Sequence, residues 1–257
     1  MSDVWVSWSG GKDAATALAT ARASGLRVTG LLSTTARPAG AAAEIPVHGV
    51  GLPLLEAQAA ALGLPLHTVE LPSPCPDGEY TARIRAALAT ARAAGVSRLV
   101  CGDLALADVR AFREAVLAGT GVAGEFPLWG TDTAELARRM IGDGLRAVVV
   151  AVDPARLPAG LAGRAFDAAF LGDLPAGIDP CGENGEFHTF VTGGPGFGHD
   201  VSVDVAGTVE RDGHVQAVLV PAGQPATSER STDSPACSSA NDVDSGAGPI
   251  RRPSGPR

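Results

Sequence analysis

The sequence predicts an α/β protein: a larger domain around a parallel sheet, followed by a smaller α+β subdomain. Short apolar runs alternate with alanine-rich amphipathic segments, the pattern of strands and helices that take turns along a chain. Three amphipathic segments stop at Gly25, Gly63 and Gly95, and glycine is the usual residue just past a helix end. With 45% hydrophobic residues among 257, the chain can bury a sizeable core.

The first part of the chain contains four predicted strand and helix pairs. Strands are predicted over residues 4–8, 28–33, 66–71 and 99–101, and helices over 13–23, 54–62, 77–94 and 109–117. The texture of the sequence changes after Gly124, so we assign residues 1–124 to the first domain.

The second part, residues 125–221, is predicted to be the smaller subdomain. It contains a predicted helix over 133–141, strands over 147–152, 201–205 and 215–220 in a mixed sheet, and a glycine-rich loop that enters a strand over 181–191. Residues 222–257 are serine, proline, glycine and charge with few large apolar side chains. Such a segment buries too little to offset the entropy of ordering, so we expect a disordered tail.

The carboxyl ends of the first-domain strands carry the polar residues that interest us most. Ser9 to Asp13 follow the first strand, Ser33 ends the second, and Gly102 and Asp103 follow the fourth. Ligands of open α/β sheets bind outside these strand ends. We therefore expect these residues to face one crevice.

The run Ser9, Gly10, Gly11, Lys12 and Asp13 predicts a phosphate-binding loop between a strand and a helix. A glycine pair lets the backbone approach phosphates, the helix start presents free amides, and Lys12 adds a cation. The run has neither the spacing of a P-loop nor that of a dinucleotide-binding fingerprint. The alternative is a glycine turn that serves chain geometry alone.

Charge and composition narrow the choice of partners and compartment. A net charge of −8 and a pI near 5.1 argue against DNA or an anionic membrane as the main partner. No uninterrupted apolar stretch of about 18 residues occurs, and the first residues do not resemble a signal peptide. The four cysteines are widely spaced, as in a reducing cytoplasm. We expect a cytoplasmic protein, and a homodimer is left open.

The phosphate loop resembles a known sequence motif. Its SGGKD run is similar to the SGGxDS loop of the ATP pyrophosphatase superfamily, in which the loop grips the pyrophosphate and AMP is transferred to an acceptor. The serine that usually closes the loop is Ala14 here, which removes one hydroxyl from the phosphate cradle. This resemblance implies an adenine nucleotide alpha hydrolase-like fold that uses ATP with Mg²⁺.

Further segments resemble one family within that superfamily, the diphthine-ammonia ligase family. They are residues 47–49, 102–103, Asp108 with Arg113, 127–129 and above all 181–187. The resemblance spans roughly residues 4 to 191 and implies a carbon-nitrogen ligase that activates a carboxylate as an acyl-adenylate and joins it to ammonia. The composition looks bacterial, and bacteria are not expected to make diphthamide. The acceptor, a small-molecule or protein carboxylate, is therefore left open, as is an amine in place of ammonia.

Acidic residues are the candidates for metal binding and catalysis. Asp13 and Asp103 are candidate Mg²⁺ ligands, because magnesium takes one or two carboxylates and keeps several waters. Asp103 is also a candidate catalytic residue, whereas the helix dipole alone explains an aspartate at position 13 equally well. Glu183 and Glu186 flank a glycine in a largely apolar stretch, and we predict that they attract an ammonium or amine and remove its proton. The alternative is a charged hairpin rim.

Two other functions are compatible with the same loop. One is a thiolation or other nucleotide-modifying enzyme acting on RNA, a function that Cys181 suggests. The lack of a CxxC pair and of a basic domain argues against it. The other is a regulatory module that binds ATP or AMP without turnover, which Ala14 keeps open. His48 and His188 are read as local hydrogen-bonding residues, because no histidine spacing indicates zinc.

Overall fold

The computed structural model describes residues 3–37 and 43–223 of the chain. These residues belong to one compact unit, Met1–Gln224. The predicted tail lies outside the described residues, except for its first two positions.

A sheet of five parallel strands lies at the centre of the first half, as predicted. In spatial order its strands are β5 (Leu66–Leu71), β2 (Arg27–Ala36), β1 (Asp3–Ser7), β6 (Val96–Val100) and β7 (Ala123–Glu125). Two short antiparallel strands, β3 (Glu44–Ile45) and β4 (Val50–Gly51), extend this sheet from β2. The chain steps from β1 to β2 on one side and later to β6 on the other. The switch point, where such sheets bind ligands, therefore lies between β1 and β6.

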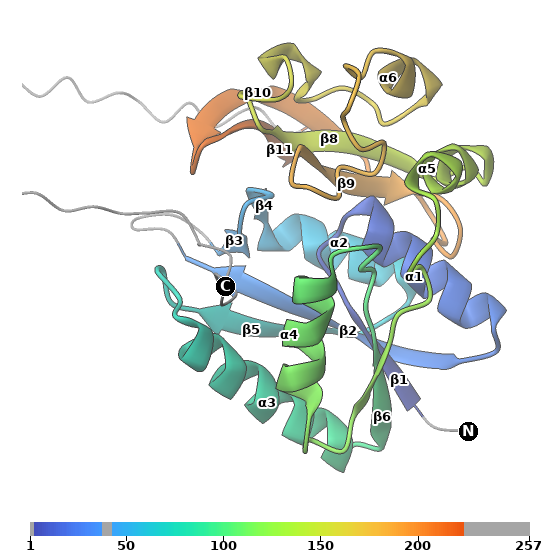
Figure 1. Ribbon diagram of the computed structural model, residues 1–257, viewed down its shortest axis with the longest axis vertical. Coiled ribbons are helices and arrows are strands. Elements are labelled where there is room, and N and C mark those ends of the chain that lie inside the picture. The colour runs from blue at the N-terminus through green and yellow to red at the C-terminus, as the bar shows by residue number, and fades with distance from the viewer. Residues whose placement is uncertain (1–2, 38–42, 224–257) are drawn as a thin grey trace, which may run out of the picture. The chain divides into compact units, whose positions relative to one another are not determined.

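Helices cover both faces of the parallel sheet (Figure 1). Helices α1 (Lys12–Ala23) and α2 (Leu52–Leu62) lie on one face, and α3 (Asp77–Ala93) and α4 (Ala107–Leu117) lie on the other. Successive side chains of β1 point to opposite faces of the sheet, so β1 contributes to the core on both sides. Val4 and Val6 pack towards α1, while Trp5 packs in the cluster under α3. Gly63 ends α2 in the left-handed conformation, with φ 64°, as its position in the sequence predicted.

The second half forms a four-stranded sheet whose strands all pair antiparallel. Its order is β10 (Val203–Arg211), β11 (His214–Pro221), β8 (Arg146–Val152) and β9 (Phe187–Gly193). The prediction of a mixed sheet was wrong, and so were the bounds 201–205, because the strand runs on through the exposed hairpin arm to Arg211. The remaining elements are α5 (Thr133–Gly142), α6 (Ala168–Gly172) and the 3₁₀ turn Ala159–Leu161.

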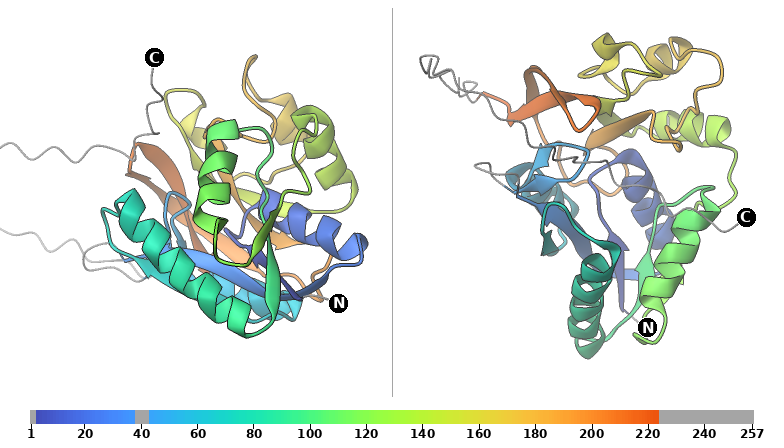
Figure 2. Two further views of the ribbon diagram at one scale, coloured as in Figure 1. Left: turned by 60° about the horizontal axis from the view of Figure 1, so that its bottom comes forward. Right: turned by 60° about the vertical axis from the view of Figure 1, so that its left-hand side comes forward.

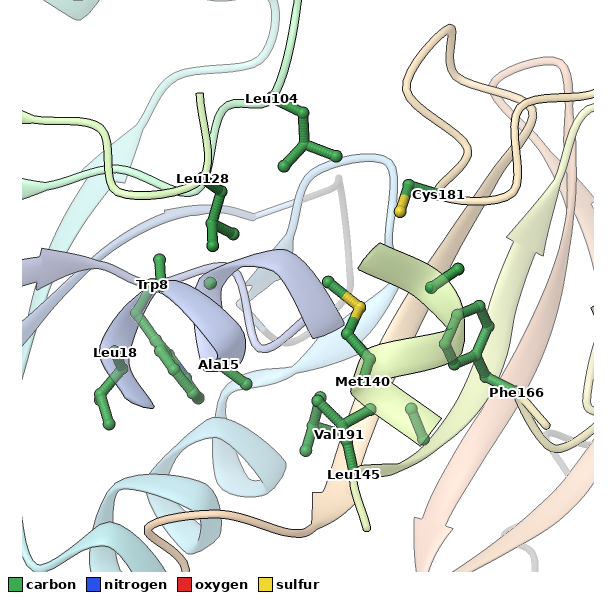
Figure 3. Close-up of a cluster of buried hydrophobic side chains, with 14 of the residues drawn as sticks. Trp8, Ala15, Leu18, Leu104, Leu128, Met140, Leu145, Phe166, Cys181 and Val191 are labelled. Atoms are coloured by element: carbon green, nitrogen blue, oxygen red, sulfur yellow. The ribbon is translucent and has the colours of Figure 1, made fainter. Parts of the chain in front are cut away.

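The two sheets share one hydrophobic cluster, with α1 and α2 between them (Figures 1 and 2). Figure 3 shows this cluster, in which Trp8, just after β1, and Leu18 of α1 lie with Met140 of α5 and Val191 of β9. Helix α1 is therefore buried along the side that faces the second sheet, and its first turn is enclosed.

No helix within 3–37 and 43–223 combines the length and apolarity that a membrane span needs.

Candidate active site

The predicted phosphate loop lies at the switch point, between β1 and α1. Gly10 has φ +78°, a conformation that glycine adopts without strain. A Cβ at Gly10 would lie 2.8 Å from Gln58 Oε1, and one at Gly11 would lie 3.2 Å from the Thr189 carbonyl oxygen. The close approach of α2 and the positive φ therefore require glycine at position 10, while β9 leaves little room for a side chain at position 11.

Strand β9 of the second sheet holds the loop by hydrogen bonds. The Val191 amide donates to the Gly10 carbonyl at 2.9 Å, and the Lys12 amide donates to Thr189 Oγ1 at 3.0 Å. The Gln58 amide group bridges the two, donating to the carbonyls of Gly10 at 3.0 Å and Val191 at 2.6 Å. The phosphate loop is thus built by both halves of the chain. Gln58 and Thr189 were not predicted from the sequence, because Gln58 is one of two polar residues in α2 and no local pattern distinguishes it from the exposed Glu56.

Lys12, the only lysine of the chain, is buried with 2% of its surface exposed. Its Nζ lies 2.8 Å from Asp13 Oδ2, donates to the Cys181 carbonyl and lies 5.3 Å from the centroid of the Phe187 ring. Burial lowers the pKa of Lys12, but Asp13 and further neighbouring groups raise it more, so the net pKa is raised and the amine stays charged. In this structure the ammonium faces the second sheet.

Asp13 carries an oxygen that nothing in the described residues satisfies. Its Oδ2 pairs with Lys12, but its Oδ1 is buried without a hydrogen-bond partner, although 32% of the side chain as a whole is exposed. Burial raises the pKa of Asp13 more than the adjacent Lys12 charge lowers it. A buried and unpaired carboxylate oxygen is costly, so the position is suited to a cation or a hydrogen-bond donor.

The carboxyl end of β6 lies on the other side of the switch point and contacts the first turn of α1. A Cβ at Gly102 would lie 2.8 Å from the carbonyl carbon and oxygen of Asp13, so only glycine lets β6 end against the first turn of α1. Asp103 beside it is paired with Arg113, whose Nε lies 2.9 Å from Oδ1 and 2.7 Å from Oδ2. Burial lowers the pKa of Arg113, but Cys101 and Asp103 raise it more. The Asp103 charge is therefore already balanced, and its roles in catalysis and metal binding stay predictions.

The two glutamates of the glycine-rich loop have different surroundings. Glu183 is half-buried, and its Oε1 accepts from the amides of Leu104, Ala105 and Leu106 at 3.0–3.4 Å, just before α4. Burial raises the pKa of Glu183 and the Asp13 charge adds to this, while the amides oppose it. Its carboxylate thus lies on the side of the site formed by the end of β6.

Glu186 is fully buried, with 0% of its surface exposed. It accepts from the amides of Asp179 and Asn184 and lies 2.9 Å from Arg156. These partners make it the residue that shapes the loop around Glu183. Its predicted part in proton removal is not supported by this placement.

The hydroxyl of Ser33 is committed within the fold. It is buried and donates to the Trp8 carbonyl at 2.6 Å. Ser9, at the start of the loop, accepts from the Gly11 amide at 3.4 Å and is partly exposed. Of the two predicted serines, Ser9 is the partly exposed one, and its part in nucleotide binding stays a prediction.

A cavity of about 130 Å³ opens at the carboxyl ends of β1 and β2, beneath α3 and α4. Its polar lining comes from Ser7, Ser9, Thr34 and Arg113, and its aromatic lining from Trp8, Tyr80 and Phe112. Among residues 3–37 and 43–223, no group of three His, Cys, Asp or Glu side chains is arranged to hold a metal ion. A metal here would rest on one or two protein ligands, as magnesium often does.

Two buried cysteines, Cys101 and Cys181, do not have the surroundings of reactive thiols. Burial raises the pKa of Cys101 to about 11 and that of Cys181 to about 12. Thiols with raised pKa values are protonated and inert at neutral pH. The geometry therefore gives no support to sulfur transfer by either of them.

Two family models match the chain: the diphthamide synthase N-terminal domain over residues 2–123 and the diphthamide synthase C-terminal domain over residues 132–219. The chain belongs to the diphthamide synthase family. Domains of this family imply an ATP pyrophosphatase-type enzyme, and the resemblance read from the SGGKD loop and residues 181–187 is confirmed. The N-terminal match ends at the first residue of β7, and the C-terminal match covers α5 and the antiparallel sheet except the last two residues of β11.

Nine chains of solved structures also match this diphthamide synthase-family protein. One is described as a predicted subunit of tRNA methyltransferase from Methanocaldococcus jannaschii, with 17% sequence identity and a TM-score of 0.37. The match covers 60% of this chain and 78% of that one. A likeness at this TM-score supports no conclusion about function. No curated protein matches the chain.

Proposed function

We propose that this protein is an ATP-dependent amide ligase. A carboxylate attacks the α-phosphate of ATP to give an acyl-adenylate and pyrophosphate, and ammonia or an amine then displaces AMP to leave an amide. The observation that carries the proposal is the buried, unpartnered Oδ1 of Asp13 in the first turn of α1, at the switch point of a diphthamide synthase-family sheet.

The nucleotide is assigned to the carboxyl ends of β1 and β2. The aromatic side chains of Tyr80 and Phe112 line the cavity there and suit a purine base, and Ser9, shortly before the first turn of α1, lines it as well. The helix start beside Gly11 carries a positive dipole end, which favours phosphate groups. The triphosphate therefore runs from the cavity towards the first turn of α1.

Asp13 is the residue that would hold Mg²⁺, since its Oδ1 is a buried oxygen without a partner. A bound magnesium ion would neutralise charge on the triphosphate and on the departing pyrophosphate. Lys12 keeps Asp13 in place from behind, by the ion pair between Nζ and Oδ2. Asp103 would be a second ligand only by giving up part of its pairing with Arg113.

Glu183 belongs to the acceptor side in this proposal. Its carboxylate accepts hydrogen bonds from the amides of residues 104–106 at the edge of the proposed nucleotide site. It is close enough to Asp13 for that charge to raise the pKa of Glu183. Without a metal between them a carboxylate repels a triphosphate, so Glu183 is better suited to take a proton from the nitrogen nucleophile than to contact the nucleotide. A carboxylate with a raised pKa is also a better proton acceptor than an ordinary one.

Product analysis tests the proposal. The protein is incubated with ATP, Mg²⁺, ammonium and a fractionated cell extract as the source of carboxylates, and phosphorus NMR follows the products. We expect AMP and pyrophosphate in equal amounts, strict dependence on a fraction of the extract, and loss of the activity in Asp13→Asn. ADP with inorganic phosphate, or no turnover with any fraction, would refute the ligase assignment.

A further inference from the structure

A second cluster of polar side chains lies beside the phosphate loop, and the proposed reaction has not used it. We call it the histidine pocket: His48, His188, His214 and Gln216. The ring centroids of His48 and His188 are 4.6 Å apart, and those of His188 and His214 are 6.0 Å apart. Each of the three histidines, taken as a whole residue, is partly exposed. The members come from the turn between β3 and β4 and from two strands of the second sheet.

The register of the second sheet places His188 and Gln216 in one row with Ala151. His188 of β9 pairs with Ala151 of β8, and Ala151 pairs with Gln216 of β11, so the three side chains stand in one row on one face. His214 lies two residues from Gln216 and shares that face. The small side chain of Ala151 separates His188 and Gln216, whose Cα atoms are about 10 Å apart across two strand spacings. The row therefore has a polar side chain on either side of the small side chain of Ala151.

The turn that supplies His48 is strained and fitted to Gln216. Val47 has φ 66°, an outlying conformation for a β-branched residue. Its carbonyl accepts from Gln216 Nε2 at 3.0 Å, and a Cβ at Gly49 would collide with Gln216 Oε1. Gln216 is 2% exposed, yet its Oε1 is buried without a hydrogen-bond partner among the described residues. An acceptor left unpaired in so constrained a place points to a ligand that donates to it.

The imidazoles add further acceptors. His48 Nδ1 lies 3.3 Å from the Pro46 carbonyl, and His214 Nδ1 lies 3.1 Å from the Asp212 carbonyl. A carbonyl oxygen only accepts, so each Nδ1 carries the proton, and each Nε2 keeps its lone pair while the ring is neutral. Burial, with the Lys12 charge, lowers the pKa of His48 to about 4, and burial also lowers that of His188. These two rings are therefore neutral at pH 7.

We propose that the histidine pocket binds the nitrogen nucleophile, as ammonia or as the amino group of a small primary amine. Such a group carries the N–H donors that the acceptors His48 Nε2, His214 Nε2 and Gln216 Oε1 need. Donating its N–H groups leaves the nitrogen lone pair free to attack. A metal ion fits less well, because no three side chains of the metal-binding types are suitably arranged in the described residues.

The pocket is joined to the phosphate loop through β9. His188 precedes Thr189, whose Oγ1 accepts from the Lys12 amide, so one strand connects the two sites. The Lys12 charge lowers the pKa of His48 and His188 and disfavours a second cation in the same way. The pocket thus favours the uncharged amine, which is the reactive form. This inference rests on the proposed ligase reaction and names where its nitrogen substrate waits.

Binding is tested by NMR without ATP, which keeps the result independent of the ligase assignment. Protein labelled with ¹⁵N-histidine gives signals from five imidazoles, of which His67 and His199 serve as internal references. Ammonium chloride and methylammonium chloride are titrated against sodium chloride at equal ionic strength. We expect saturable shifts of the Nε2 signals of His48 and His214 with the first two salts only. The smaller ligand alone would identify ammonia, and both would identify an amine-tolerant pocket.

Gln216→Met keeps the side-chain length but removes the acceptor, and we expect it to weaken binding by about 10- to 100-fold, the cost of a lost hydrogen bond to a buried polar ligand. His214→Asn, at a partly exposed position, is the second variant in case the first does not fold. In the ligase assay either variant should raise KM for ammonium and leave KM for ATP unchanged, with His199→Asn as the matched control.

Three outcomes would overturn the proposal. They are shifts as large with sodium chloride, absence of saturation in the folded protein, and tight zinc binding that displaces ammonium. Failure of the ligase reaction with intact ammonium binding would instead refute the proposed function and leave the pocket standing.

Discussion

Replacing Lys12 with methionine removes the buried cation that joins the phosphate loop to the second sheet. Methionine retains most of the apolar volume between Phe166 and Phe187, so the loss is mainly electrostatic. Removing one partner of a buried ion pair costs about 3–5 kcal/mol. Because 32% of the Asp13 side chain is exposed, water offsets part of that cost, and we expect about 3 kcal/mol. For a folded unit of this size, that loss lowers Tm by about 6–12 °C.

Thermal and urea unfolding of Lys12→Met measure the loss directly. The double variant Lys12→Met with Asp13→Asn no longer leaves a buried carboxylate unpaired, so it should recover part of the stability. Lys12 is the only lysine, so an amine-reactive reagent offers an independent check: in the folded protein it should modify the α-amino group and spare Lys12. A Tm within 2 °C of the wild type (about 1 kcal/mol or less), together with rapid modification of Lys12, would show that the lysine is free and that our account of its burial is wrong.

Three further substitutions test separate parts of the site. Glu183→Ala leaves the amides of residues 104–106 without their acceptor, so we expect the free energy of unfolding, measured in urea, to fall by about 1–3 kcal/mol. Glu183→Gln should keep most of the stability and slow amide formation while ATP binding persists. Loss of ATP binding in the glutamine variant would contradict the acceptor-side role. Gly102→Ala pushes a Cβ against the Asp13 backbone, so it should lower stability by about 1–3 kcal/mol and weaken ATP binding measured by calorimetry; unchanged affinity would separate β6 from the nucleotide site. In the folded protein the pKa of His48 is lowered to about 4, so on acidification the unfolded chain takes up the His48 proton first. Stability therefore falls from about pH 6.5 towards pH 4, by up to about 2 kcal/mol at pH 5. His48→Gln should flatten this fall, and an equally steep curve would count against a neutral His48.

The elements with a strong local signal were predictable. Residues 66–71 form β5 at the predicted bounds, and α2 ends at Gly63 because glycine adopts the left-handed conformation there. Strands β3 and β4 have two residues each, and β7 has three, too short for any alternation of apolar residues. In strand β10 the alternation of Val203 and Val205 is interrupted at the register shift between Val205 and Gly207, so the pattern did not predict the rest of the strand.

The site was predictable where it depends on the strand ends, and not where it depends on packing between the two sheets. The sequence places Ser9, Asp13 and Gly102 after the strands that meet at the switch point, and the structure brings the three positions together. The burial of Lys12 and of Glu186 results from contacts made about 170 and 30 residues away along the chain, with Cys181 and Arg156. No local pattern encodes such contacts.

The central claim is that ATP is split between its α and β phosphates, and two ATP analogues test it most directly. One carries a methylene bridge between the α and β phosphates, and the other carries it between the β and γ phosphates. With Mg²⁺, ammonium and the active extract fraction, we expect the β,γ-bridged analogue to be consumed with release of AMP and the α,β-bridged analogue to remain intact. Consumption of the α,β-bridged analogue, with resistance of the β,γ-bridged one, would contradict the account.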